Sequence, residues 1–241
     1  MRWLWYFIFY SFCGFLLEVA FARAIGHPKR DRKCLLLLPL CPVYGLGACL
    51  ILLITPLVRS PLWVLAAGGL AATAAELAMG LFYQFVLGVK FWDYAGMRGS
   101  IGGLICPAFS LCWGMLALAL VYLVHPALAP LVERIPAGLA PPALILLGAD
   151  TLVSCVALRR TGGTEVLRWY APGCRFVPFS REKKEPKKSL KRETSFRSWG
   201  LMKGFLIKAA HGFLSVRRSL YFQTIPQRSY SSTPAVRHTA G

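Results

Sequence analysis

The sequence lacks the short motifs that mark common enzymes and nucleotide-binding proteins. It contains no GxSxG nucleophile turn, no HExxH zinc motif and no GxxxxGK[ST] phosphate loop. It also has no CxxC pair, and most of its eight cysteines lie inside apolar runs, where cysteine acts as a small hydrophobic residue. We therefore expect no enzymatic activity, no metal site and no cofactor. Any ATP-driven role needs a separate ATPase subunit.

Charge is also scarce, at 16% of the residues, whereas 56% are hydrophobic. Apolar runs of about 20 residues, the length that crosses a bilayer, recur along the first two thirds of the chain. This pattern excludes an ordinary soluble domain. It predicts an all-α, polytopic membrane helix bundle over residues 1–158 and a basic tail over residues 159–241.

Five membrane-spanning segments are expected in the bundle, at residues 3–22, 35–57, 62–87, 103–124 and 139–158. The second needs a broken or re-entrant entry near Cys41, Pro42 and Gly45, because the prolines and glycines there do not suit a regular helix. His125 and Pro126 are expected to end the fourth. Trp92, Asp93 and Tyr94 precede the fourth span, and their rings suit the membrane–water boundary.

Positive charge is unevenly distributed. Residues 159–241 hold eighteen of the 28 Lys and Arg, and most of the other ten flank the first, third and fourth spans at loops 23–33 and 88–102. Since cytoplasmic loops carry an excess of Lys and Arg, we expect the N-terminus outside and the tail in the cytoplasm of a multi-pass cell-membrane protein.

The tail itself is rich in Lys, Arg, Glu and Ser over residues 181–197, a composition typical of disorder. Residues 198–220 can be drawn as a basic amphipathic helix that would lie on anionic lipid of the inner leaflet. An extension without a function fits equally well. Nucleic acid is a less suitable partner beside a membrane.

Three carboxylates are predicted to lie at similar depth in the cytoplasmic half of the bundle: Glu18, Glu76 and Asp150. A carboxylate in hydrocarbon costs several kcal/mol, and the expected spans contain no Lys, Arg or His to neutralise it. We interpret the three acids as lining one polar, cytoplasm-facing cavity, with Tyr44, Ser110 and Trp113 as further candidates. The alternative is three separate, protonated packing groups.

Several of these segments together resemble one family of bacterial membrane proteins, the putative ABC-transporter type IV family. The resemblance rests on these segments in this order: YSFCGFLLE from Tyr10, CPVYG from Cys41, Glu76, WDY from Trp92, and GLICPAFSLCWG from Gly103. It covers residues 1–158 and implies a permease-like protein of the bacterial inner membrane, without a substrate. The chain departs from the family pattern at Gly102–Cys106, where an Asn and an Arg are usual.

These observations predict a permease-like subunit of an ABC-type transporter, with a polar site open to the cytoplasm. The alternative is a membrane scaffold or regulatory protein that transports nothing and holds partners through its cytoplasmic loops and tail. The gene for an ATPase beside this one would favour the first, and loss of partner binding on tail deletion would favour the second.

Overall fold

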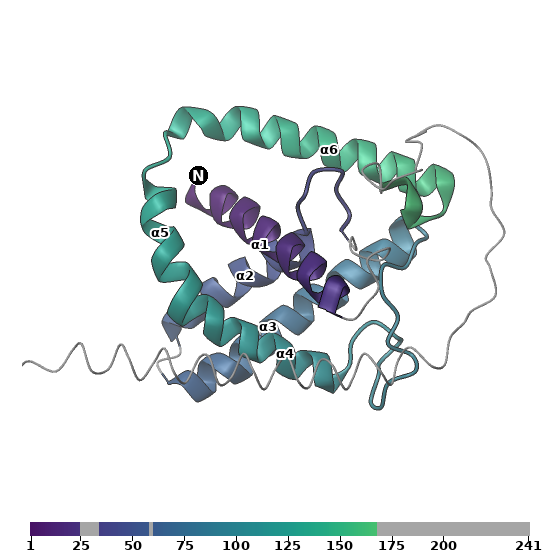
Figure 1. The fold of residues 1–241 in the computed structure, drawn as a ribbon, viewed down its shortest axis with the longest axis horizontal. Helices are drawn as coiled ribbons and strands as arrows, with labels where there is room; N and C mark the ends of the chain where they lie inside the picture. Colours follow the sequence, from purple (N-terminus) through teal and green to yellow (C-terminus); the bar gives the residue numbers. More distant parts are fainter. Residues whose placement is uncertain (25–33, 58–59, 168–241) are drawn as a thin grey trace, which may run out of the picture.

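The computed structural model describes residues 1–24, 34–57 and 60–167, and this part of the chain is helical without strands (Figure 1). Its α-helices are α1 (Arg2–Ala24), α2 (Pro42–Ile54), α3 (Pro61–Leu81), α4 (Pro107–Ala119), α5 (His125–Glu133) and α6 (Ala140–Thr161). Two π-helical turns, Phe82–Val86 and Leu120–Val124, extend α3 and join α4 to α5. The predicted tail helix at 198–220 lies outside the described residues.

Four helical stretches are long and apolar enough to cross a membrane: Arg2–Ala24, Pro61–Val86, Pro107–Glu133 and Ala137–Thr161. The all-α membrane bundle predicted from the sequence is thereby confirmed. The second expected span differs from the others, because its helical part, Pro42–Leu57, is shorter. At 1.5 Å per residue it covers roughly 24 Å, less than the hydrocarbon thickness of a bilayer.

The fourth span differs from the prediction at both ends. It begins at Pro107 rather than Gly103, because residues 101–105 form a tight turn with a bridge between Ile101 and Ile105. It continues past His125 to Glu133, so the prediction that His125 and Pro126 end it is wrong. The π-helical turn directly before His125 interrupts the regular hydrogen-bond ladder, and a proline that cannot donate is tolerated there.

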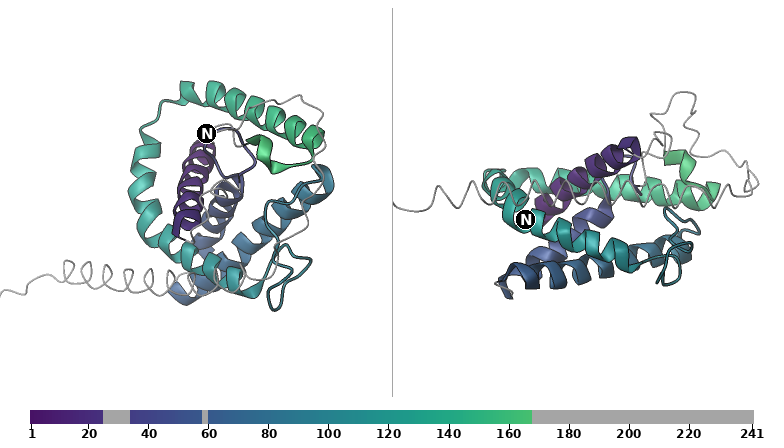
Figure 2. Two further views of the ribbon diagram at one scale, coloured as in Figure 1. Left: turned by 45° about the vertical axis from the view of Figure 1, so that its right-hand side comes forward. Right: turned by 60° about the horizontal axis from the view of Figure 1, so that its bottom comes forward.

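Small residues let the helices approach closely. A side chain at Gly14 of α1 would overlap the Tyr44 ring of α2, and one at Gly45 of α2 would overlap Ser11 of α1. The contacts between α3 and α4, which lie side by side in Figure 2, follow the same pattern. A Cβ on Gly114 of α4 would lie 2.7 Å from the Leu65 carbonyl oxygen of α3. Glycines thus determine the helix–helix distances in this bundle.

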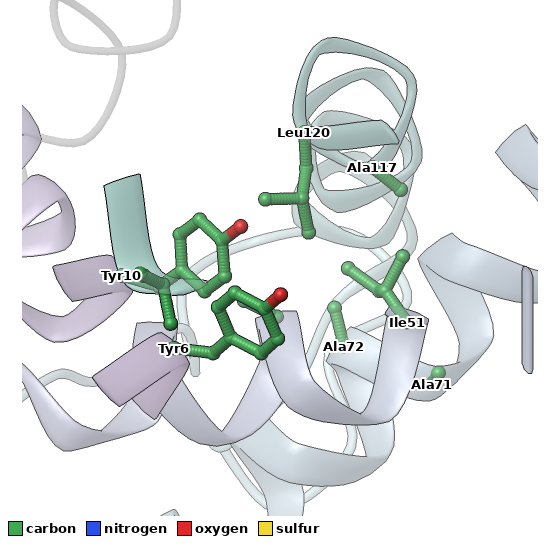
Figure 3. Close-up of a cluster of buried hydrophobic side chains, with 9 residues drawn as sticks. Tyr6, Tyr10, Ile51, Ala71, Ala72, Ala117 and Leu120 are labelled. Carbon is green, nitrogen blue, oxygen red and sulfur yellow. The ribbon is translucent and has the colours of Figure 1, made fainter. Parts of the chain in front are cut away.

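One buried cluster joins the first four helices. Figure 3 shows Tyr6 and Tyr10 of α1 projecting toward Ile51 of α2 and toward Leu120, which follows α4. Ala72 of α3 belongs to the same cluster.

The segment from Cys34 to Cys41 is non-helical and closed by a disulfide between these two residues, whose Cα atoms are 4.7 Å apart. The Cys41 N–H donates to the Ser11 carbonyl, 2.8 Å away, so this segment reaches the middle of α1. Leu36 is 1% exposed and packs in a second buried cluster that includes Leu158 of α6. Most residues of this segment are therefore buried by protein, as irregular backbone inside a membrane requires, whereas Pro39 is exposed.

The predicted irregular entry to the second span is present, but it lies at residues 34–41, before the helix, and not at residues 41–45. Cys41 precedes α2, Pro42 is its first residue, and Gly45 lies in its first turn. Proline is favoured at a helix start because its missing N–H is not needed there. The disulfide was not predicted, because its cysteines are seven residues apart and match no short motif.

Candidate functional site

The site begins where α1 meets the start of α2. The Tyr44 hydroxyl donates a hydrogen bond of 2.8 Å to Oε1 of Glu18. Gly14 lies one turn before Glu18 on α1, and because it has no side chain the Tyr44 ring packs directly against the helix there. The phenol and the carboxylate are thereby held together by backbone packing as well as by their hydrogen bond.

Glu76 is the most buried of the six cavity candidates, with 3% of its surface exposed. Its Oε1 accepts a hydrogen bond of 2.9 Å from the Tyr94 hydroxyl, and its Oε2 accepts one of 3.0 Å from the Trp113 indole N–H. Both carboxylate oxygens therefore have a neutral donor, one from the connection before α4 and one from α4 itself.

The two carboxylates are joined through their aromatic partners, since the ring centroids of Tyr44 and Trp113 are 5.0 Å apart. We call Glu18, Tyr44, Glu76, Tyr94 and Trp113 the acidic–aromatic network. Glu18 and Glu76 lie roughly 9 and 15 Å from the carboxyl ends of their helices, and Tyr44 and Trp113 lie near the starts of theirs. The chain reverses direction between these helices, so all of these positions fall toward one end of the bundle.

The connection before α4 positions Tyr94 through its backbone. The Tyr94 N–H donates to the Gly103 carbonyl at 2.8 Å, and the Trp92 indole N–H donates to the Leu104 carbonyl at 2.9 Å. Asp93 Oδ1 accepts the Ala95 N–H at 2.9 Å. Gly103 has φ 73°, and a Cβ there would lie 2.7 Å from Asp93 Oδ1, so only glycine suits the position.

Tyr94 therefore belongs to the network, although the sequence predicted that its ring would lie at the membrane–water boundary. Its ring stacks on Phe109 with centroids 4.4 Å apart. Burial, together with the negative charge of Glu76, raises the pKa of the Tyr94 phenol well above its usual range. The phenol consequently keeps its proton and acts as a hydrogen-bond donor to Glu76 over the physiological pH range.

Asp150 has different partners. Its two carboxylate oxygens accept the backbone N–H groups of Leu37 and Leu38, each at 3.0 Å, and one of them also accepts the Ser154 hydroxyl. The aspartate thereby provides acceptors for backbone N–H groups of the non-helical segment between Cys34 and Cys41. The structure thus joins Glu18 and Glu76 in one network but assigns Asp150 to a structural contact of α6.

Ser110 also lies apart from the network contacts, because its hydroxyl bonds to the Cys106 carbonyl of its own helix at 3.2 Å. Of the six cavity candidates, four are therefore brought together: Glu18, Tyr44, Glu76 and Trp113. Tyr94 joins them, although the sequence suggested a boundary position for it. The signal for Tyr94 was its place directly before a turn rich in glycine, which returns the chain toward α3.

Within residues 1–24, 34–57 and 60–167, neither Glu18 nor Glu76 forms an ion pair. The ion pair found in these ranges joins Arg2 to Glu133 at 3.6 Å, between two exposed side chains. Neutral donors reduce the cost of burying a carboxylate but do not cancel its charge. The network can therefore take up a proton, a cation or a further hydrogen-bond donor.

A comparison with protein-family models finds one described as putative ABC-transporter type IV, which matches residues 5–156. The match spans the whole acidic–aromatic network and the segment that Asp150 holds. No curated protein and no solved structure matches the chain.

Proposed function

Since the chain belongs to the putative ABC-transporter type IV family, we propose that it is the permease-like membrane subunit of an ABC-type transporter. The observation that supports this most is the acidic–aromatic network. Two carboxylates from different helices each accept hydrogen bonds from aromatic side chains, and the rings of two of these donors, Tyr44 and Trp113, lie 5.0 Å apart. One of the carboxylates, Glu76, is buried among apolar helices. Such carboxylates are costly in a membrane and mark substrate or ion pathways.

In this proposal the network receives a cationic or hydrogen-bond-donating group of the substrate. Glu76 and Glu18 supply the negative charge, and the rings of Tyr44 and Trp113 supply faces that attract a cation. The distribution of Lys and Arg in the sequence predicts that the bundle end nearest the network faces the cytoplasm, so in this proposal the network lies on the side of the ATPase subunit. The proposal assigns no catalytic step to the chain itself.

The test has two stages. Full-length protein is purified in a mild neutral detergent, and the co-purifying proteins are identified. We expect an ATPase subunit, whose hydrolysis of ATP rises when the membrane chain is present. Recovery of the chain without any ATPase, from cells that express it at natural levels, would contradict the assignment to an ABC-type transporter.

The second stage uses Glu76→Gln, which keeps the side-chain shape and removes the charge, with Glu133→Gln as the matched control at an exposed carboxylate. Both variants should still bind the ATPase subunit. Only Glu76→Gln should lose coupled ATP hydrolysis, by at least tenfold. Full coupling in Glu76→Gln would exclude the network from the transport step.

The scaffold alternative makes an opposite prediction for residues 159–241. If the chain acts by holding partners through its tail, deletion of the tail abolishes partner binding, whereas Glu76→Gln has no effect. If the chain is a permease subunit, the tail deletion leaves the ATPase subunit bound to the helix bundle.

A further inference from the structure

A cavity of about 210 Å³ lies at the other end of the bundle, away from the acidic–aromatic network. It is lined by Arg2, Trp3, Tyr6, Leu52 and His125. These residues come from the start of α1, the end of α2 and the start of α5. Tyr6 precedes Glu18 on the same helix by roughly 18 Å, so the cavity and the network are distinct sites.

His125 is held in this cavity from two sides. Its Nδ1 forms a hydrogen bond of 2.7 Å with the Tyr10 hydroxyl, and its ring meets the Tyr6 ring edge-on with centroids 5.1 Å apart. Tyr6 and Tyr10 stack along α1, and Figure 3 shows them next to each other in the buried cluster. The imidazole is therefore fixed by side chains that belong to the core.

The hydrogen bond to Tyr10 links the tautomer of His125 to the burial of the phenol. Tyr10 is 3% exposed, and a buried phenol needs an acceptor for its O–H. In the tautomer in which Nδ1 accepts that proton, the neutral ring carries its own hydrogen on Nε2. His125 thus offers the cavity a donor and not an acceptor.

Arg2 adds a positive charge to the cavity wall. Its partner Glu133 is 3.6 Å away, and the two side chains are 71% and 59% exposed. Exposed ion pairs of this kind contribute little, so the guanidinium can turn to a better acceptor at small cost. Trp3, Tyr6 and Leu52 complete the wall with apolar surface.

From this donor set we propose that the cavity binds an anionic oxygen group, a carboxylate or phosphate, carried on a small apolar or aromatic body. Arg2 holds the anion with its paired N–H groups, and the Nε2–H of His125 donates a second hydrogen bond. The apolar body packs on Trp3, Tyr6 and Leu52. Two sources carry this chemistry: a dissolved organic anion and the headgroup of an anionic lipid.

The probe is phenyl phosphate, titrated by calorimetry into the full-length protein in nanodiscs of phosphatidylcholine. Salt at about 0.3 M suppresses non-specific binding by the basic tail. The variants are Arg2→Gln and His125→Gln, and the matched control is Arg134→Gln, an exposed cation at the same end of the bundle that does not line the cavity. We expect each cavity variant to weaken binding about tenfold and the control to match the native chain.

A second arm distinguishes the two sources. In nanodiscs that contain phosphatidylglycerol, a lipid-headgroup site is already occupied, so phenyl phosphate binds the native chain more weakly than in phosphatidylcholine alone. A site for dissolved anions binds it equally in both. The proposal is overturned if phenyl phosphate fails to bind the native chain in phosphatidylcholine, or if Arg2→Gln binds it as tightly as Arg134→Gln.

Discussion

Glu76 illustrates how much of a membrane fold can serve a single charged group. Its two oxygens are met by a phenol from the connection before α4 and an indole from α4. Neither donor brings a charge, so the carboxylate is solvated by neutral groups and its charge stays available to a ligand or a proton. A salt bridge would have offset the burial cost but would have occupied the site.

Replacement of Glu76 separates its structural from its functional contribution. Glu76→Gln retains one oxygen acceptor, so we expect a modest loss of stability, whereas Glu76→Leu leaves both the Tyr94 hydroxyl and the Trp113 N–H without an acceptor. Each unsatisfied donor costs about 1–3 kcal/mol. Thermal unfolding in detergent, followed by near-ultraviolet circular dichroism, should rank the stabilities native, Gln, Leu. Equal midpoints for Gln and Leu would show that the two donors do not depend on the carboxylate.

At the scale of helices, close packing of α1 on α2 positions Tyr44 against Glu18. The methyl group added by Gly14→Ala would overlap the Tyr44 side chain, whereas the one added by Gly148→Ala on α6 would have no neighbour within 4 Å. Overpacking costs about 1–3 kcal/mol, and Gly to Ala in an open helix position is neutral or favourable. We expect Gly14→Ala to lower the unfolding temperature and Gly148→Ala to leave it unchanged or raise it. The reverse order would contradict the packing described here.

Asp150 is predicted to hold α6 against the segment from Cys34 to Cys41. Asp150→Ala removes the carboxylate that accepts from the Leu38 N–H and one of the two oxygens that accept from the Leu37 N–H, the other being the Ser154 hydroxyl, so this segment should lose protection in hydrogen exchange. Thr151→Ala, the next residue, removes only a hydroxyl that bonds within its own helix and serves as the control. Loss of protection around Glu76 instead would mean that Asp150 supports the network after all.

The sequence predicted the helices well because apolar length and glycine or proline breaks are local signals. The spans at residues 3–22 and 62–87 match α1 and the extended α3 to within two residues. The distance of each acid from the end of its helix could be predicted for the same reason. Their grouping was not predictable, because depth does not say which way a side chain points. Asp150 has the same depth signal as Glu76, yet the backbone it binds becomes visible only once α6 is placed beside residues 34–41.

At the scale of the molecule, the chain presents two chemically different ends. Figure 1 shows the N-terminus and the α5–α6 connection at one end, with the connection before α4 and the end of α6 at the other. The first end carries the cavity of Arg2 and His125, and the second leads to the acidic–aromatic network. A donor-rich site and an acid-rich site at opposite ends suit a protein that meets different ligands on the two sides of a membrane.

The charges at these ends predict the orientation in the membrane. Among the described residues, the network end holds five cations (Arg23, Lys90, Arg98, Arg159 and Arg160), whereas the cavity end holds Arg2 and Arg134. Because Lys and Arg accumulate on the cytoplasmic side, the network should face the cytoplasm and the cavity the outside.

Alkaline phosphatase, which is active only outside the cytoplasm, should therefore be active when fused after Arg134 and inactive when fused after Arg98. A variant with Lys90, Arg98, Arg159 and Arg160 changed to Gln should weaken this preference only in part, because loop 23–33 and the rest of the tail keep their Lys and Arg, whereas Arg2→Gln and Arg134→Gln should leave it unchanged. Activity after Arg98 in the native chain would reverse both ends, and with them the proposal that the network faces an ATPase subunit.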